Sequence, residues 1–148
     1  MEEQKRRIYS RENCCRKRRE YFGKGISFNQ ETTLCGHSII RNINTAIKLN
    51  YEIELNYVGV SSSKLAIDRV DKRVKMGGHG IPREYIERRY KESLKNLKKI
   101  IPICNYVIIY DNSELFRKVA TYVKGKCVDI TEDVPEWCSD IISHIYNT

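Results

Sequence analysis

The residues best suited to chemistry on an anion lie in one stretch, residues 69–90, RVDKRVKMGGHGIPREYIERRY. Arg69 and Arg73 are four residues apart, so on a helix they would share one face. Arg88 and Arg89 follow within a second helical pattern. An arginine guanidinium stays charged and presents a planar fork of donors to phosphate oxygens. Two helices carrying such side chains can close over a phosphorylated ligand.

Between the two helices lie three glycines, at positions 77, 78 and 80, with His79 among them. Glycine ends helices, and Pro82 fits the first turn of a new helix, where its missing N–H is no loss. The pattern therefore predicts two helices, within residues 64–99, joined by a glycine hinge. We call this region the lid and expect it to be mobile and to grip phosphate. A histidine between glycines is also typical of a turn residue that tolerates left-handed geometry.

Short polar segments follow three strand patterns, at residues 31–33, 61–63 and 111–113. They include Glu31, Thr33, Asp111 and Asn112. In open α/β sheets the ligand site lies at the carboxyl ends of the strands. We therefore expect these segments to converge on one site, although asparagine and aspartate after a strand also commonly form turns.

The elements that would position these side chains alternate along the chain, which predicts an α/β fold with a parallel sheet and flanking helices in three layers. We expect a single domain over residues 1–148. Apolar spacing and turn residues predict helices over 2–22, 38–49, 83–99, 114–123 and 135–146, and a helix that is capped by Ser63, begins at residue 64 and ends before the glycines. Runs rich in β-branched and aromatic residues predict strands over 26–30, 52–60, 105–110 and 127–130.

Positive charge is concentrated in two regions of a chain whose net charge is +8. Residues 1–25 hold nine Lys and Arg against four Asp and Glu, and residues 64–100 hold twelve against five. Such clusters are compatible with a polyphosphate ligand or with nucleic acid. A basic nucleic-acid-binding or protein-interaction module is therefore the alternative to a phosphate-binding enzyme.

We base our expectations about cellular location and metal binding on features that the sequence lacks. It has neither an apolar stretch of about 18 residues, the length that spans a bilayer, nor an apolar segment near its start. We expect a cytoplasmic protein without membrane contact, and hence six reduced cysteines. Cys35 and His37 are two residues apart, but no second pair accompanies them, so we predict no metal site.

One motif expected of a nucleotide kinase is missing, because no GxxxxGK[ST] loop occurs in the sequence. Even so, from Phe28 to about Gly125 the chain resembles the zeta-toxin family of P-loop kinases, in its branch of predicted bacterial ATPases or kinases. The motifs that carry this resemblance are ETTL-x-G, a strand ending in YVG, RV-x-x-RV-x-x-GGH-x-IP, RRY and YDNS. Characterised members of this family phosphorylate UDP-N-acetylamino sugars with ATP, often as toxins with an antitoxin partner.

The resemblance implies a P-loop kinase-like fold whose first strand, phosphate-binding loop and catalytic base are missing. It also implies ATP and Mg²⁺ as cofactors, and a nucleotide or nucleotide sugar as the ligand. The chain would then be inactive alone, or would pair with a separately encoded N-terminal segment. Cys35 stands where toxin members can have an arginine.

The resemblance also assigns roles to individual residues. Arg73 matches a lid arginine that contacts ATP phosphates and the transferring group, and His79 and Arg89 are candidates for the second catalytic cation. Glu31, Thr33 and Arg88 would bind the substrate. Residues Asp111 and Asn112 would face the nucleotide.

Overall fold

The computed structural model describes residues 11–146, which form two compact units that divide after Glu31. The first unit contains helix α1, Arg11–Lys24. Gly25, with φ of 63°, ends this helix, and the N–H of Ile26 donates to the carbonyl of Tyr21 at 3.0 Å. Residues 2–10 of the predicted N-terminal helix lie outside the described part of the chain.

The strand predicted at residues 26–30 does not form. This segment is irregular, and the ring of Phe28 packs instead on Tyr21 and Phe22 of α1, with centroids 5.4 and 5.5 Å apart. Gln30 accepts a hydrogen bond from Arg18, also on α1. A strand needs a neighbouring strand for its backbone groups, and here the segment turns back on its own helix.

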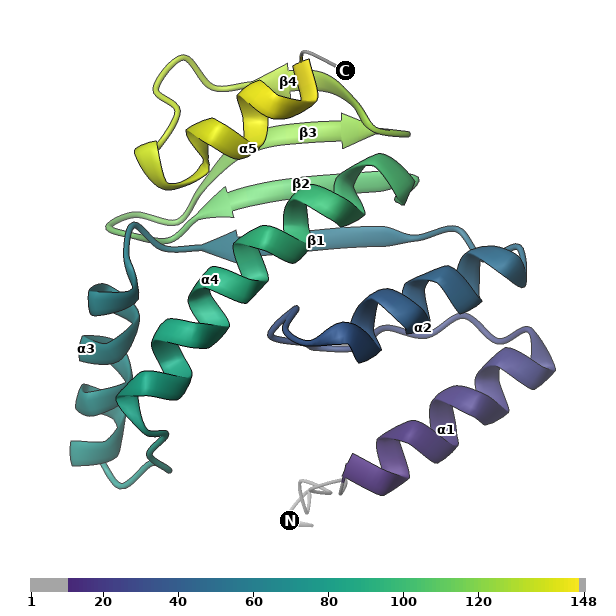
Figure 1. Cartoon of the computed structure of the whole chain (residues 1–148), viewed down its shortest axis with the longest axis horizontal. Helices are drawn as coiled ribbons and strands as arrows, with labels where there is room; N and C mark the ends of the chain where they lie inside the picture. The colour runs from purple at the N-terminus through teal and green to yellow at the C-terminus, as the bar shows by residue number, and fades with distance from the viewer. Residues whose placement is uncertain (1–10, 147–148) are drawn as a thin grey trace, which may run out of the picture. The chain divides into compact units, whose positions relative to one another are not determined.

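The second unit is a four-stranded sheet with flanking helices (Figure 1). Its strands are β1 (Glu54–Gly59), β2 (Tyr106–Asp111), β3 (Arg117–Val123) and β4 (Lys126–Ile130), adjacent in that order. Its helices are α2 (His37–Lys48), α3 (Ser63–Lys75), α4 (Arg83–Ile100), the short 3₁₀ turn η1 (Ile101–Ile103) and α5 (Glu136–Tyr146). Except for residues 114–123, these ranges agree with the predicted elements to within a few residues.

The predicted parallel sheet is correct only for β1 and β2. These strands pair in parallel through the crossover α3–α4, whereas β2–β3 and β3–β4 are antiparallel. The mixed sheet results from residues 117–123, which we predicted as part of a helix and which form strand β3. Lys124 and Gly125 join β3 to β4 with φ of 48° and 78°, the two positive values that a tight hairpin requires.

The hydrophobic core lies on one face of the sheet. Val107, Ile109 and Tyr122 from the strands meet Leu97 of α4 and Ile141 of α5, all almost fully buried. In Figure 1, α4 and α5 cross this face. The described residues of the second unit therefore do not form the three layers that we expected. Hairpin connections need no crossover helix, so the antiparallel half of the sheet gains none to cover its other face.

Candidate functional site

The carboxyl ends of β1 and β2 lie side by side, as expected for a ligand site. Gly59 pairs with Asp111, and the N–H of Asn112 donates to the carbonyl of Gly59 at 2.8 Å. Both strand ends are held by the lid helices. Arg69 of α3 donates to the carbonyl of Ser113 at 2.9 Å, and Tyr90 of α4 donates to the carbonyl of Val60 at 3.0 Å.

Asp111 is the most constrained polar residue at this edge, being 6% exposed. Its Oδ1 accepts hydrogen bonds from the hydroxyl and N–H of Ser113, at 2.6 and 3.2 Å, and from Nε1 of Trp137 at 3.0 Å. Its Oδ2 is 3.6 Å from Nε of Arg117. Burial raises the pKa of Asp111, but these hydrogen bonds and the charge of Arg117 outweigh it, so the pKa lies below its ordinary value. The carboxylate is therefore ionised and fixed in orientation.

Trp137 reaches this edge from α5 because residue 59 is glycine. A Cβ on residue 59 would lie 2.2 Å from Cη2 of the indole, which no packed structure allows. The indole also lies near Tyr57 of β1, with ring centroids 6.1 Å apart, and Tyr57 shares a hydrogen bond of 3.0 Å with Ser93 of α4. Tyr57 thus connects β1 to α5 through its ring contact with Trp137, and to α4 through its hydrogen bond with Ser93.

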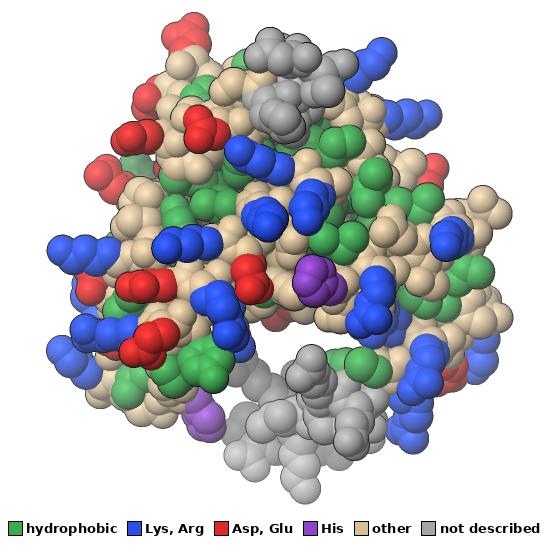
Figure 2. Space-filling view, viewed as in Figure 1, with side chains coloured by type: hydrophobic (Ala, Val, Ile, Leu, Met, Phe, Trp, Pro, Cys, Tyr) green, Lys and Arg blue, Asp and Glu red, His purple; other side chains and the backbone are tan. Residues whose placement is uncertain are grey.

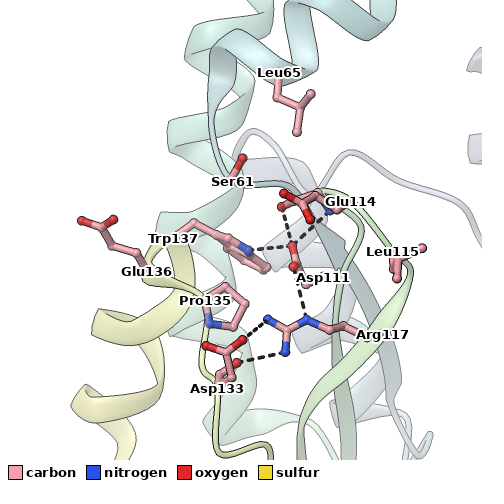
Figure 3. A pocket seen from close by; sticks show the side chains of 11 residues that line it. Ser61, Leu65, Asp111, Glu114, Leu115, Arg117, Asp133, Pro135, Glu136 and Trp137 are labelled. Carbon is pink, nitrogen blue, oxygen red and sulfur yellow. Dashed lines mark hydrogen bonds and ion pairs between the residues drawn. The ribbon is translucent and has the colours of Figure 1, made fainter.

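A cavity of about 700 Å³ opens at the carboxyl end of β2 (Figure 3). Its lining consists of Ser61, Leu65, Asp111, Ser113, Glu114, Leu115, Arg117, Asp133, Pro135, Glu136 and Trp137. Figure 3 shows Asp111 between Trp137 and Arg117, with Arg117 directed also at Asp133. Arg117 donates to the carbonyl of Asp133 at 3.0 Å. Four carboxylates against one arginine make the lining acidic, so it favours hydrogen-bond donors over phosphate.

The cations that could meet phosphate lie outside this cavity, on the lid. Leu65, Arg69 and Arg73 recur every four residues along α3, so they lie along one side of the helix, from the cavity lining outward. Arg73 is exposed, and within the described residues it forms no ion pair. Arg73 is therefore available to an anionic ligand. Arg69 is less available, because it is hydrogen-bonded to Ser113.

The glycine segment of the lid forms a defined helix end. The N–H of Gly78 donates to the carbonyl of Arg73, and the N–H of Gly77 donates to the carbonyl of Val74, both at 2.9 Å. With φ of 89° at Gly77, this is a Schellman cap. Asp71 and Arg83 form an ion pair of 2.7 Å that joins the two lid helices, in which Arg83 is largely exposed and Asp71 is partly buried. His79 is exposed in the loop between these helices.

Among the predicted substrate residues, Thr33 is exposed and directly precedes two residues that contact α4. Sγ of Cys35 lies 3.1 Å from the carbonyls of Thr33 and Arg89, and Nδ2 of Asn96 donates to the carbonyl of Leu34 at 2.9 Å. Burial raises the pKa of the Cys35 thiol, and a hydrogen bond from the side chain of Thr33 partly opposes this effect. These contacts hold Leu34 and Cys35 against the middle of the helix.

The other predicted residues are distributed as follows. Arg89 is half-buried, whereas the guanidinium carbon of Arg88 lies 4.7 Å from the ring centroid of Tyr85 on the exposed side of α4. Glu31 is exposed and is the last residue of the first unit. Asp111 and Asn112 lie at the strand edge as expected.

Three site residues were not among those that we predicted: Arg117, Asp133 and Trp137. Arg117 was missed because residues 114–123 were assigned to a helix, which hides its pairing with Asp111. Trp137 is the chain's single tryptophan, and it comes two residues after Pro135, at the start of the last helix. The glycine that ends β1 could have signalled its position, because glycine within a strand often marks a close approach.

Neither a metal cluster nor a membrane-spanning helix is found in the described part of the chain. No three His, Cys, Asp or Glu side chains between residues 11 and 146 are arranged to hold a metal ion. Likewise, no helix there has the length and apolar character needed to cross a bilayer.

Comparison with known proteins shows similarity over part of the chain. A Haemophilus influenzae protein, described as uncharacterized, is 38% identical to this chain over 65 residues. The match spans 44% of this chain and 46% of the relative, so it covers less than half of either protein. No family model and no solved structure matches.

Proposed function

We propose that this chain is a zeta-toxin-like phosphotransferase module that binds a phosphorylated nucleotide ligand, either ATP or a UDP-N-acetylamino sugar. The observation that carries the proposal is the meeting of the β1 and β2 carboxyl ends between the two arginine-bearing helices of the lid. Ligand sites of open α/β sheets occur at such edges. The motif resemblance over residues 28–125 supplies the ligand class.

In this proposal the neutral part of the ligand and its phosphates bind to different surfaces of the protein. The acidic cavity beside Asp111 receives a neutral part rich in hydrogen-bond donors, such as a sugar or a base, because its four carboxylates repel phosphate. The phosphates extend toward Arg73 and Arg89 of the lid, with His79 as a further donor. Thr33 and Arg88 bind the acceptor side.

The residues present do not fit Mg²⁺. Asp111 already has both oxygens engaged, by Ser113, Trp137 and Arg117, and no three His, Cys, Asp or Glu side chains of the described residues are arranged to hold a metal ion. The sequence also lacks the glycine-rich lysine loop that would cradle ATP phosphates. We therefore propose ligand binding without phosphoryl transfer by this chain alone, and derive no step through the metal.

The test is calorimetric titration of the chain with ATP and, separately, with UDP-N-acetylglucosamine. Arg73→Ala should weaken binding roughly 10-fold to 100-fold, because a charge-assisted hydrogen bond contributes about 1.5–3 kcal/mol. The matched control is Lys75→Ala, which removes an exposed cation two residues away on a different side of α3. Binding of neither ligand at millimolar concentration would overturn the proposal. Phosphoryl transfer between the two ligands would refute the claim of inactivity only.

A basic nucleic-acid-binding module remains the second candidate, favoured by the cationic surface of the lid. Figure 2 shows Lys and Arg side chains distributed over the face that carries α3 and α4, with acidic groups among them. Fluorescence anisotropy with a labelled single-stranded oligonucleotide separates the two functions. Nucleic-acid binding should fall steeply with salt, and Arg73→Ala and Lys75→Ala should weaken it equally.

A further inference from the structure

The face of the sheet opposite the core is amphipathic. Because side chains alternate along strands, residues paired across the sheet point to the same side. The face opposite the core therefore carries Val58 on the outer strand β1, and Tyr106, Ile108 and Tyr110 on β2. Val58 is 50% exposed and Tyr106 43% exposed, and none of the four belongs to the core of the described residues. We call this surface the open face.

Aromatic side chains make the open face more apolar than an ordinary solvated sheet surface. The Tyr110 ring stacks on Phe116, with centroids 4.9 Å apart and planes 17° from parallel, and Phe116 is 61% exposed. In Figure 1 the helices α4 and α5 cross the other side of the sheet. Contiguous exposed apolar surface of this kind commonly marks an interaction site.

The charged side chains of the open face balance, and most of them lie on the outer strands β1 and β4. The strand register places Glu54, Tyr106, Val123 and Lys126 in one row across all four strands. The row thus begins with an acid on β1 and ends with a base on β4. The next row begins with Asn56 on β1 and ends with Asp129 on β4. Ile108 and Thr121 lie between them. Asp129 also pairs with Lys118 of β3.

This distribution is self-complementary under a two-fold rotation. When two copies pack with their open faces together about an axis parallel to the strands, β1 of one lies over β4 of the other. Glu54 then faces Lys126 of the second copy, and Lys126 faces its Glu54. Tyr106 lies over Val123, and Asn56 meets Asp129. With two acids and two bases, the face has no net charge that would favour nucleic acid or an anionic membrane.

We propose that the open face is the interface of a two-fold symmetric homodimer, with Glu54 and Lys126 forming two equivalent ion pairs at its rim. The apolar centre supplies the driving force, and the ion pairs fix the orientation, which is the usual division of roles at protein interfaces. This inference is independent of the ligand site, which lies at the carboxyl edge of the sheet.

The oligomeric state of the full chain tests the proposal. Light scattering after size exclusion should give a mass near twice 17.4 kDa, falling toward the monomer on dilution. Glu54→Lys and Lys126→Glu should each weaken dimerisation roughly tenfold or more, because each places two like-charge pairs across the interface. The double variant Glu54→Lys/Lys126→Glu restores opposite charges and should dimerise as the native chain does. Glu87→Lys and Lys95→Glu, both exposed on α4, are the matched controls and should have no effect.

Zero-length carbodiimide cross-linking provides a second measurement that does not depend on variants. Within one chain, Glu54 and Lys126 lie on the outer strands of a four-stranded sheet, about 14 Å apart by the usual strand spacing, too far for an amide bond to join them. An amide between Glu54 and Lys126 should therefore occur only in the cross-linked dimer. A monomer at all concentrations, or a dimer without this cross-link and without rescue by the double variant, would overturn the proposal.

Discussion

At the scale of single residues, Asp111 organises the candidate site because four groups converge on one buried carboxylate. The hydroxyl and the N–H of Ser113 and the indole of Trp137 fix one oxygen, and Arg117 lies beside the other. The orientation of a carboxylate held in this way is set before any ligand arrives, which lowers the cost of ligand binding. Asp111 also links β2, β3 and α5, so its charge contributes to stability as well as to the site.

Replacing this carboxylate tests its contribution to stability. Asp111→Asn should lower the free energy of unfolding by about 1–3 kcal/mol at neutral pH, because hydrogen bonds to a charged acceptor are lost. The folded-state pKa is below the ordinary value of 3.8, so the carboxylate stabilises the fold fully above that pH. The stabilisation is lost as pH falls through the folded-state pKa. Urea unfolding followed by circular dichroism should therefore show the difference between native chain and variant shrinking below about pH 4.

A matched substitution distinguishes this effect from a general loss of charge. Asp140 is exposed on α5, and Asp140→Asn should change the free energy of unfolding by less than about 0.5 kcal/mol. If Asp111→Asn were equally neutral, or if its effect were constant down to the lowest pH, the hydrogen-bonded carboxylate would not be the stabilising group.

The sequence predicts a residue of this site when the signal lies in its immediate neighbours along the chain. It does not predict contacts between residues that are far apart in the sequence. Asp111 and Asn112 were predicted because they directly follow a strand pattern, which is a local signal. Arg73 was predicted from its spacing on a helix and from the family resemblance. The partners of Asp111 could not be found in this way, because Trp137 is 26 residues away and meets Asp111 only through the packing of α5 over Gly59.

At the scale of elements, the lid shows glycines acting as a helix cap. The sequence pattern predicted a hinge, and the geometry gives a Schellman motif in which two N–H groups close on the end of α3. Arg73 supplies one of the two carbonyls, so the cap also holds the backbone of the residue proposed to grip phosphate. Motion of the lid, if it accompanies ligand binding, must therefore occur with this cap intact or by breaking two hydrogen bonds.

The cap can be tested by alanine substitution at each glycine. Gly77→Ala should cost about 1 kcal/mol in the free energy of unfolding, since φ of 89° is unfavourable for a residue with Cβ. Gly78→Ala should also destabilise, because its Cβ would lie 2.9 Å from the carbonyl oxygen of Arg73. Gly80→Ala is the control, since its Cβ would meet only a Val74 methyl at 3.4 Å. Equal thermal stability of all three variants would contradict a structural role for the cap.

Prediction of the fold succeeded where a segment shows one clear hydrophobic periodicity. It failed where helix and strand signals compete within the same short segment. Helices α2 and α4 have apolar residues at helical spacing, and both form as expected. Residues 117–123, RKVATYV, contain β-branched and aromatic side chains but are short and follow a turn. Their strand state is decided by pairing with β2 and by the Lys124–Gly125 turn, and this one misassignment also led us to predict a fully parallel sheet.

At the scale of the whole molecule, the two compact units differ in what can stabilise them. In α1 no side chain that the structure describes is fully buried, whereas α4 buries Ile86, Ser93, Asn96, Leu97 and Ile100. Helices of about 12–15 residues are marginal in water without tertiary packing. We therefore expect the two units to open with different free energies, with the sheet and its helices as the more stable one.

Native-state hydrogen exchange can measure this difference directly. Leu97→Ala should remove about 2–5 kcal/mol from the second unit, because Leu97 is fully buried in its core. The slowest amides of α4, β2 and β3 should lose protection by that amount, while those of α1 keep their native exchange rates. Leu115→Ala is the matched control, since Leu115 is 80% exposed, and it should leave both units unchanged. Equal loss of protection in α1 and α4 would instead mean that the chain unfolds as one cooperative unit, because amides that exchange through a shared opening report the same free energy.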